Sequence, residues 1–382
     1  MSTKTPVQKR RKRKPRKQFQ LFVKGQYFDF PMLFIVIFLV CFGLIMIYSS
    51  SSYRANINLG DPAYYLKRQG MWAVIGLFGM MIVSTFHYKF YMKFTVLVYV
   101  FAIFLQILVL LLPNSSHGAK RWIVLGPIQF QPSEFSKVAL ILFLAHILTL
   151  TVKQVRTLRG LIKVGAFAIP LFVLIGAENL STSLVILGIT IIMLFVTSPK
   201  YLPFIVMIGA GAVLGGIVLL SAGYRMERIE IWLDPANHVK GMQTMQALYA
   251  IGSGGIFGKG LGQSMQKMGF IPESHNDMIF SIVCEELGLF GAICIIAMFM
   301  MLLWRIMYIA NNAPDLYSAL ICTGVMAQVG IQVFINIAVV TNTIPPTGIP
   351  LPFISYGGTS LVFLMAEMGM VLGISRHIRI KK

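Results

Sequence analysis

A short polar stretch at the edge of a long apolar segment contains Glu273 and Asp277, four positions apart. On a continuous helix these two carboxylates would share one face, and Pro272 is compatible with the first turn of such a helix. Two more acids, Glu285 and Glu286, lie within the apolar segment itself. A carboxylate at the boundary between water and hydrocarbon can act as a general base or as a ligand of a divalent cation. We therefore place the candidate chemistry at Asp277.

Acids that lie deeper in apolar segments favour a structural role. Carboxylates are costly inside a bilayer, and where they occur they usually pair with cations or other donors. We therefore interpret Glu285, Glu286 and Glu367 as partners of arginine or of backbone donors rather than as catalytic groups. His146, inside another apolar segment, is interpreted in the same way as a packed polar residue.

Basic residues gather around the polar connection 114–135, which contains Lys120 and Arg121, with Lys137 following in the next apolar run. Three such cations can hold a diphosphate, the arginine through its forked guanidinium. The alternative is an interfacial salt-bridge and capping site, because Glu134 stands where a helix would begin. The residues alone leave both interpretations open.

Two further connections are rich in residues that bend the backbone. The glycine run 252–262 does not fit a phosphate-binding P-loop, because Ser253 occupies the position of its first glycine. Its glycines allow either a close backbone approach to a phosphate or sugar, or a hinge between two helix pieces. The prolines of 342–356 exclude a helix and predict a rigid re-entrant turn. In that turn Ser355 and Tyr356 either offer hydroxyls to a ligand or serve the architecture alone.

The composition indicates a membrane protein with a helical backbone. Hydrophobic residues make up 57% of the 382 residues and charged residues only 12%, whereas an ordinary soluble domain carries about 25% charged residues. Apolar runs of about 20 residues are long enough to cross a bilayer, and the alternation of a membrane barrel is not visible. We predict an all-α polytopic membrane fold with ten transmembrane helices. The predicted spans are 31–50, 69–86, 91–113, 136–152, 160–177, 181–198, 202–221, 277–304, 315–341 and 357–374.

The distribution of basic residues predicts the orientation of these spans. Residues 1–24 contain ten Lys or Arg and no acid, which predicts a disordered cytoplasmic tail in contact with anionic membrane lipids. With ten spans, the basic connection 152–160 and the basic tail 375–382 lie on the same side as the N-terminus, as the positive-inside rule requires. The formal net charge of +20 is thereby explained without a nucleic-acid partner.

The membrane domain is predicted to cover 25–374, and its longest connection, 222–276, lies on the extracytoplasmic face. A structureless connection of that length is uncommon unless it has a function. The stretch 242–251 lacks turn formers and is amphipathic, so we expect this part of the connection to be helical. Long polar insertions on one face indicate an active or binding face outside the cytoplasm.

Five polar motifs occur in an order that resembles one family, the shape, elongation, division and sporulation (SEDS) proteins RodA and FtsW. The resemblance covers nearly the whole chain after the basic tail. The motifs are Lys120-Arg121-Trp122 with Gln131-Pro132-Ser133-Glu134, the glycine run at 254–262, Pro272-Glu273-Ser274-His275-Asn276-Asp277, Glu285-Glu286-Leu287-Gly288, and Pro352-Phe353-Ile354-Ser355-Tyr356-Gly357-Gly358.

This resemblance implies a ten-helix peptidoglycan glycosyltransferase in the bacterial cytoplasmic membrane, with both termini in the cytoplasm. Such proteins polymerise lipid II at the outer face of that membrane and leave undecaprenyl diphosphate as the second product. They work with a class B penicillin-binding protein in the division or elongation complex. The acid of the family's Pro-Glu-x-His-x-Asp motif matches Asp277, which is therefore the expected catalytic residue. A Mg²⁺ or Mn²⁺ ion bound by Asp277 is the alternative role of this carboxylate.

Substrate contacts are expected at the outer ends of the spans. The family's Glu and Lys at the start of the fourth span match Glu134 and Lys137. Positive charge there would stabilise a leaving diphosphate, and Arg225 or Arg228 would add to it. The expected substrate-binding residues are Lys120, Arg121, Glu134, Lys137, Glu273, His275, Ser355 and Tyr356.

The chain departs from the family in one stretch. Many members carry Gln-Pro-Asp-Leu-Gly-Thr between the fifth and sixth spans, whereas residues 177–182 here read Ala-Glu-Asn-Leu-Ser-Thr. The aspartate of that stretch is therefore not carried over. In this respect the chain resembles division-type FtsW proteins more than RodA.

Two other functions are compatible with the same side chains. A flippase for lipid-linked precursors would need acids and bases through the depth of the membrane, whereas the motifs here cluster at the predicted outer face. A non-catalytic division scaffold would explain the basic tail but not the buried acids. The clustering therefore favours the enzyme over both alternatives.

Deletion of residues 1–17 is expected to leave lipid II polymerisation by purified protein nearly unchanged, because so polar a segment cannot pack into a core. Polymerisation would be measured on the correctly inserted, purified protein, beside the full chain. Localisation or partner recruitment in cells is where an effect is expected. Loss of polymerisation in the purified protein would show that the tail acts at the site.

Overall fold

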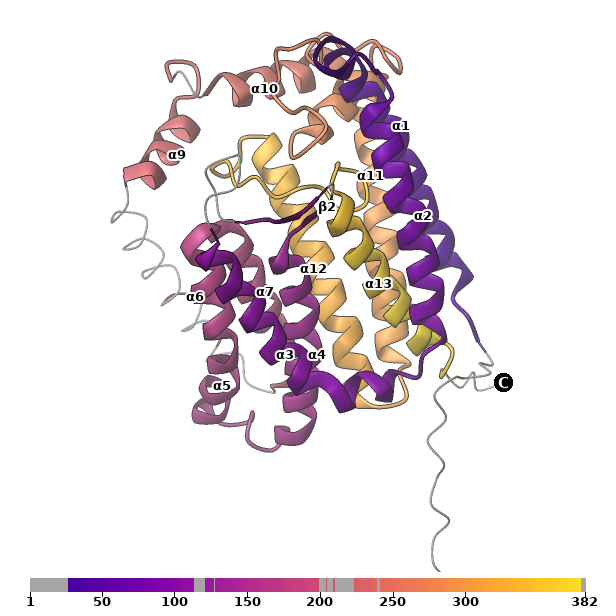
Figure 1. Cartoon of the computed structure of the whole chain (residues 1–382), viewed down its shortest axis with the longest axis vertical. Coiled ribbons are helices and arrows are strands. Elements are labelled where there is room, and N and C mark those ends of the chain that lie inside the picture. The colour runs from indigo at the N-terminus through magenta and orange to yellow at the C-terminus, as the bar shows by residue number, and fades with distance from the viewer. Residues whose placement is uncertain are drawn as a thin grey trace, which may run out of the picture.

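The computed structural model describes residues 27–112, 121–126, 128–198, 204, 209, 223–238 and 241–378. Within them the chain forms a helical bundle with one small hairpin (Figure 1). Its elements are α1 (Phe30–Leu59), α2 (Tyr64–Thr85), α3 (Tyr88–Leu111), β1 (Ile123–Leu125), β2 (Ile128–Phe130), α4 (Pro132–Thr151), α5 (Leu158–Gly165), η1 (Ala166–Ala168), α6 (Ile169–Glu178), α7 (Leu180–Thr197), α9 (Gly223–Leu233), α10 (Met242–Gly254), α11 (Ile279–Asn311), α12 (Leu316–Val340) and α13 (Gly358–Ser375).

The bundle confirms the prediction of an all-α membrane protein. Eight helical segments of the described chain are long and apolar enough to cross a bilayer: α1, α3, α4, the run from α5 to α6, α7, α11, α12 and α13. The predicted span 69–86 falls within α2, a helix of 22 residues, except for its last residue. Apart from residues 204 and 209, the predicted span 202–221 lies outside the described residues. The count of ten therefore stays a prediction.

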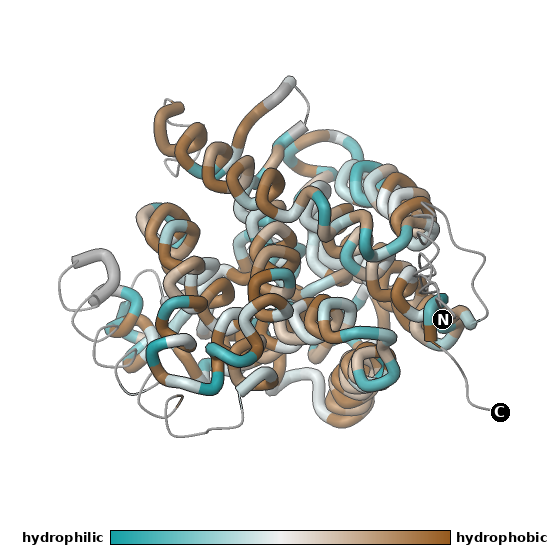
Figure 2. Tube along the Cα trace, turned by 90° about the horizontal axis from the view of Figure 1, so that it is seen from below, coloured by the Kyte–Doolittle hydropathy of each residue, from teal (hydrophilic) through white to brown (hydrophobic). Residues whose placement is uncertain are grey.

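The outer surface of the bundle is apolar, as contact with lipid requires. Large hydrophobic side chains point outward, with Phe34 66%, Phe78 69% and Leu97 66% exposed. Figure 2 looks along the bundle, where hydrophobic stretches dominate the helices and hydrophilic residues gather mainly in the turns. These outward-facing side chains need no protein partner, because lipid tails cover them.

Helices α2 and α13 approach each other closely through small residues. A Cβ built on Gly369 of α13 would lie 2.5 Å from the Met80 carbonyl oxygen of α2. At the outer end, the backbone N–H of Gly357 donates to Oε1 of the buried Gln69 over 3.2 Å. Close backbone contact of this kind is how helices associate in lipid, where burial of apolar area gives little driving force. The start of α13 is thereby fixed against α2.

Helix α11 differs from the predicted span in its start and in its continuity. It begins at Ile279, and residues 272–278 before it form turns, so Glu273 and Asp277 do not share a helical face. Glu273 itself has a left-handed backbone, with φ of 51°. Within α11, Gly288 leaves the helical region, with φ of 68° and ψ of −168°. A positive φ is accessible to glycine at little cost, which explains why the helix breaks at this residue.

The glycine run packs into this break. Neither the ligand-binding interpretation nor the hinge interpretation of this run anticipated the contact. The backbone N–H of Lys259 donates to the Glu285 carbonyl, and that of Leu289 donates to the Gly255 carbonyl, over 3.0 and 2.9 Å. A Cβ on Gly258 would lie 2.2 Å from the Glu286 carbonyl oxygen. The glycines therefore permit a close approach to the chain's own helix rather than to a phosphate. Helix α10 confirms the expected helical part of the long connection and ends just before this contact.

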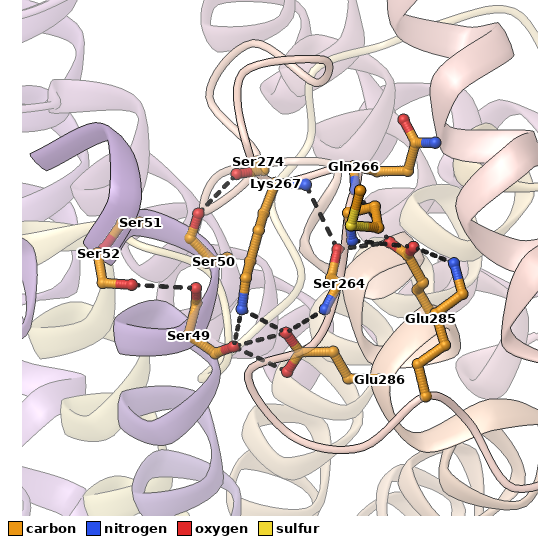
Figure 3. A network of polar contacts seen from close by, with 12 residues as sticks. Ser49, Ser50, Ser51, Ser52, Ser264, Gln266, Lys267, Ser274, Glu285 and Glu286 are labelled. Carbon is orange, nitrogen blue, oxygen red and sulfur yellow. Dashed lines mark hydrogen bonds and ion pairs between the residues drawn. The ribbon is translucent and has the colours of Figure 1, made fainter. Parts of the chain in front are cut away.

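Glu285 holds the connection that follows the glycine run. Its carboxylate, fully buried, accepts hydrogen bonds from Lys259 Nζ over 2.7 Å, from the Met265 backbone N–H over 3.1 Å, and from the Ser264 hydroxyl. The Gln266 N–H adds a longer bond of 3.4 Å. Figure 3 shows Ser264 and Gln266 beside the Glu285 carboxylate. The predicted role as a structural partner is confirmed, with backbone donors as expected and with lysine in place of arginine.

Glu286, also fully buried, ties the same connection to α1. Lys267 Nζ lies 2.8 Å from Glu286 Oε1 and 3.0 Å from the Ser49 hydroxyl, which itself donates to Glu286 over 2.6 Å. Ser274, further along, donates to the Ser50 carbonyl over 2.9 Å (Figure 3). Bonds to α1 and α11 thus fix the part of the connection that directly precedes residues 272–278.

The two described ends of the chain meet at the other end of the bundle. Arg305 of α11 pairs with the buried Asp29 over 2.5 and 3.2 Å, and Asp29 also accepts the Met32 N–H that begins α1. The Asp29 N–H donates to the Ser375 hydroxyl at the end of α13. Helices α9 and α10 lie at the opposite end (Figure 1). This arrangement agrees with both termini on one side and the long connection on the other.

A cysteine at Asn237, which is exposed in the connection after α9, is expected to react with an impermeant reagent in intact cells. A cysteine at Lys153, exposed between α4 and α5 at the other end, serves as the matched control and should react only after permeabilisation. Both would be made in a chain whose native cysteines are replaced. The reverse pattern would reject the predicted orientation.

Replacement of Lys267 by Met is expected to cost about 3 to 5 kcal/mol of stability, because it leaves the Glu286 carboxylate buried without its cation. Lys259→Met is the matched control, because Lys259 is 34% exposed and Glu285 keeps its other donors. A loss of about 1 kcal/mol or less is expected there. Unfolding temperatures of both purified variants would be compared, and equal losses would contradict the assignment.

Candidate functional site

A pocket opens at the end of the bundle that carries α9 and α10. It encloses about 370 Å³ of empty space, its open mouth included, and is bounded by α4, α12, α13 and the connection 342–356. Its polar lining comes from Glu134, Gln332, Ser355 and Tyr356, with Ser360 completing it. Three of the sequence-predicted site residues thus line one cavity, although Glu134 is far along the chain from the adjacent Ser355 and Tyr356.

Asp277 lies just before α11, next to the connection 342–356, and is not itself among the residues that line the pocket. Its backbone carbonyl accepts a hydrogen bond of 2.7 Å from Asn336 Nδ2. Its side chain points toward the turn at Gly348, where a Cβ would lie 3.8 Å from Asp277 Oδ2. Burial raises the pKa of the Asp277 carboxyl, and the charge of Glu273 acts in the same direction, whereas Arg228 opposes both. A raised pKa suits a group that must accept a proton near neutral pH.

The proline-rich connection is confirmed as a non-helical turn, and its hydroxyl groups serve the backbone. The Ser355 hydroxyl donates to the Asn276 carbonyl over 2.7 Å and accepts the Leu351 N–H over 2.8 Å. The Tyr356 N–H donates to the His275 carbonyl over 2.9 Å. Ser355 therefore acts as an architectural tie between the pocket wall and the stretch before Asp277, while still lining the cavity.

His275 packs among aromatic rings next to the pocket. Its ring centroid lies 4.3 Å from that of Tyr65 and 5.5 Å from that of Tyr356. Burial lowers the pKa of His275 to about 4, so the imidazole is neutral at physiological pH. Glu273, by contrast, is exposed and accepts a 2.7 Å hydrogen bond from Asn276. Of these two predicted ligand residues, only Glu273 presents a charge to solvent.

Glu134 and Lys137 form an ion pair of 2.9 Å at the start of α4. Lys137 is 1% exposed, and the neighbouring Glu367 is fully buried and accepts a 2.9 Å hydrogen bond from Gln328. The salt-bridge interpretation is therefore correct for Lys137, whereas Glu367 bonds a glutamine amide in place of the expected arginine or backbone donor. Glu134 alone of this group reaches the pocket lining.

Arg121 has a different partner and lines a second pocket. Its guanidinium donates to the Glu178 carbonyl at the end of α6 over 2.8 and 3.1 Å. The second pocket, of about 280 Å³, also includes Ser133 and Asn179. Arg121 and Lys137 thus belong to separate groups, so the predicted three-cation cluster is wrong for this pair. Lys120 lies outside the described residues.

Asn179 shows how the divergent stretch 177–182 folds. Its side-chain oxygen accepts the Thr182 N–H over 3.2 Å and so caps the N-terminus of α7. An amide serves at a helix N-terminus about as well as a carboxylate does. The departure from the family pattern therefore preserves the break between α6 and α7.

Several polar residues near the site were not predicted from the sequence. Arg68 donates to the Tyr64 hydroxyl over 3.0 Å, and its charge acts on Tyr356. Arg54 lies near enough to His275 for its charge to lower the pKa of that ring further. On α12, the buried Gln332 lines the pocket. Polar side chains inside an apolar span were the available signal for Gln332, whereas nothing in the spacing singled out either arginine.

The side chains around Asp277 offer few ligands for a metal ion. Among the described residues, no three His, Cys, Asp or Glu side chains come together as a metal-binding group. Mg²⁺ is often held by only one or two carboxylates together with substrate phosphates. Asp277 fits that limited role, with Glu273 as the nearest acid acting on it.

The family model described as "Cell cycle protein", covering FtsW, RodA and SpoVE, matches residues 30–380. Stage V sporulation protein E of Bacillus subtilis is 39% identical over 359 residues, which cover 92% of this chain and 98% of that protein. A probable peptidoglycan glycosyltransferase FtsW of Geobacter sp. (strain M18) is 35% identical over 362 residues, covering 92% and 98%.

Two solved structures share the fold over nearly the whole chain. A chain reported under "Structural coordination of polymerization and crosslinking by a peptidoglycan synthase complex" superposes with a TM-score of 0.79 at 28% identity, covering 93% of this chain and 99% of that one. The rod shape determining protein RodA of Thermus thermophilus gives a TM-score of 0.69 at 26% identity, covering 93% and 98%. The chain belongs to the SEDS family, which includes FtsW, RodA and SpoVE.

Proposed function

We propose that this chain is a peptidoglycan glycosyltransferase that polymerises lipid II into glycan strands at the outer face of the cytoplasmic membrane, during division or elongation. The observation that carries the proposal is the pocket between α4, α12, α13 and the connection 342–356, whose lining residue Ser355 bonds the carbonyl of Asn276, the residue before Asp277. The names of the relatives, which include peptidoglycan glycosyltransferases, support the same activity.

The reaction joins a sugar hydroxyl of one substrate to the anomeric carbon of another. The new bond forms between the hydroxyl oxygen and that carbon, while the bond from the carbon to the lipid diphosphate breaks. The hydroxyl proton passes to Asp277, whose raised pKa suits it as a general base. Undecaprenyl diphosphate leaves with the electron pair of the broken bond, and positive charge near the pocket stabilises it.

The charges available for the leaving diphosphate differ from the predicted set. Arg228 of α9 donates to the Pro346 carbonyl over 3.2 Å and therefore lies next to the connection 342–356. The charge of Arg54 acts on His275, and the charge of Arg68 acts on the neighbouring Tyr356. We assign leaving-group stabilisation to these arginines. Lys137 acts indirectly, because its ion pair orients Glu134 toward the pocket.

A divalent cation is the second role that we propose for Asp277. A Mg²⁺ or Mn²⁺ ion held there would neutralise the diphosphate, and it would lower the pKa of the carboxyl where burial raises it. With one or two protein carboxylates, such an ion would depend on the substrate phosphates for its other ligands. Dependence of polymerisation on added Mg²⁺ or Mn²⁺ after chelation would separate this role from that of a base.

The partners follow from the proposed reaction. A product strand must be crosslinked, so we propose a class B penicillin-binding protein as the partner within the division or elongation complex. The similarity to a chain of a synthase complex that couples polymerization and crosslinking supports this. Both termini are proposed to lie in the cytoplasm, where the basic tail meets anionic lipids.

A flippase is the alternative function, and the burial of the deeper charges argues against it. Such a protein needs charged or polar groups open to the headgroup along its path across the membrane. Below the pocket, Lys137 is 1% exposed and Glu367 is fully buried, and each is engaged by a neighbour. In the described part of the chain these charges hold the bundle together rather than line a passage.

Asp277→Asn is expected to retain folding and lipid II binding but to abolish polymerisation, because an amide accepts no proton and binds a divalent cation weakly. General-base catalysis contributes about 10²- to 10⁴-fold, which sets the scale of the loss. Glycan-strand formation would be measured on purified protein with lipid II, alone and with the penicillin-binding partner.

Glu273→Gln is the matched control, because Glu273 is exposed and carries the same charge close by. A milder effect is expected from it. Chains of near-normal yield and length from Asp277→Asn would remove this residue from catalysis and reopen the flippase interpretation.

A further inference from the structure

Helix α12 carries three amide side chains on one face, at Gln328, Gln332 and Asn336. Residues four apart lie above one another on a helix, so the three form a line along α12. All three are buried, at 2%, 7% and 1% exposure. Buried amides inside an apolar span are costly unless they are used. The three have different partners, and Asn336 is the one that reaches the candidate catalytic residue.

The stretch before α11 is tied to the pocket wall through three consecutive carbonyl groups. The His275 carbonyl accepts the Tyr356 N–H, and the Asn276 carbonyl accepts the Ser355 hydroxyl, over 2.9 and 2.7 Å. The Asp277 carbonyl accepts Asn336 Nδ2 over 2.7 Å. The first two ties come from the connection 342–356, whereas the third comes from a membrane-spanning helix.

Asn336 also holds the opposite side of the site. The same Nδ2 that reaches Asp277 donates to the Ile349 carbonyl over 2.9 Å. Ile349 directly precedes Pro350 and Leu351, which line the pocket. One amide nitrogen thus joins the turn that carries Asp277 to the segment that leads into the pocket wall. The amide has two N–H groups, one for each carbonyl.

We propose that Asn336 is a positioning residue for Asp277, which it holds at a fixed place relative to the pocket wall by donating to both carbonyls. The proposal rests on the catalytic role of Asp277 proposed above. Both N–H groups of the buried Asn336 amide are taken up by backbone carbonyls, so it acts on the reaction through Asp277 and not through substrate binding. Displacement of a reacting group by about 1 Å can cost about 100-fold in rate, so a lost tie has a measurable effect.

Asn336→Ala is expected to lower kcat for polymerisation by about 10- to 100-fold while KM for lipid II changes less than about twofold. Asn336→Asp, which keeps the shape but replaces the donor nitrogen by an acceptor, should give a similar loss. Gln328→Ala is the matched control, because it removes a buried amide from the same face of α12 that bonds Glu367 instead. Its unfolding temperature should fall as much as that of Asn336→Ala, with kcat unchanged.

A double-mutant cycle with Asp277→Asn separates this proposal from the proposed function. If Asn336 acts through Asp277, adding Asn336→Ala to Asp277→Asn causes no further loss of polymerisation. A full additional loss, a rise in KM alone, or normal kcat in both Asn336 variants would overturn the positioning role while Asp277→Asn stays inactive. Failure of both variants to fold, beside a folded Gln328→Ala, would also overturn it. Only an active Asp277→Asn would count against the proposed function.

Discussion

The placement of the site depends on two adjacent buried carboxylates at a break in a membrane helix. Glu285 and Glu286 stand just before Gly288, and their donors come from the long connection before α11 and from α1. Buried ion pairs add little net stability, yet leaving one member unpaired is severely penalised. Alternative positions of the connection are therefore excluded. The start of residues 272–278 is therefore fixed in place, and these residues bond the segments beside the pocket.

From that fixed point the chain reaches the pocket through backbone carbonyls rather than through side-chain packing. Residues 275–277 each offer a carbonyl to the wall formed by 342–356 and α12. Backbone groups at such a turn cannot bond within a helix and must find other partners when buried. The same bonds that satisfy this requirement orient the Asp277 carboxyl. The carbonyl groups of residues 275–277 thus satisfy their own hydrogen-bonding requirement and also serve the proposed positioning of Asp277.

Composition and periodicity were sufficient to predict the helical membrane fold, because crossing a bilayer demands long apolar segments. They also located Glu273, Asp277 and the turn that contains Ser355. What they missed depends on contacts between distant segments. The glycine run was expected to meet a ligand or act as a hinge, yet it packs on α11, and Arg121 bonds a carbonyl instead of joining Lys137. Spacing along a chain does not reveal which backbone groups remain unpaired after folding.

The contact between the glycine run and α11 also limits how these positions can change in evolution. A Cβ on Gly258 would lie 2.6 Å from the Gly288 backbone nitrogen, and a Cβ on Gly288 would lie 2.3 Å from the Gly258 nitrogen. Both additions would occupy the same space, so a second substitution at one position cannot compensate for the first at the other. Replacement of either glycine by alanine is therefore not tolerated while the contact is kept, whether it comes first or second. Related sequences that keep this broken helix should therefore retain both glycines together or lose the contact altogether.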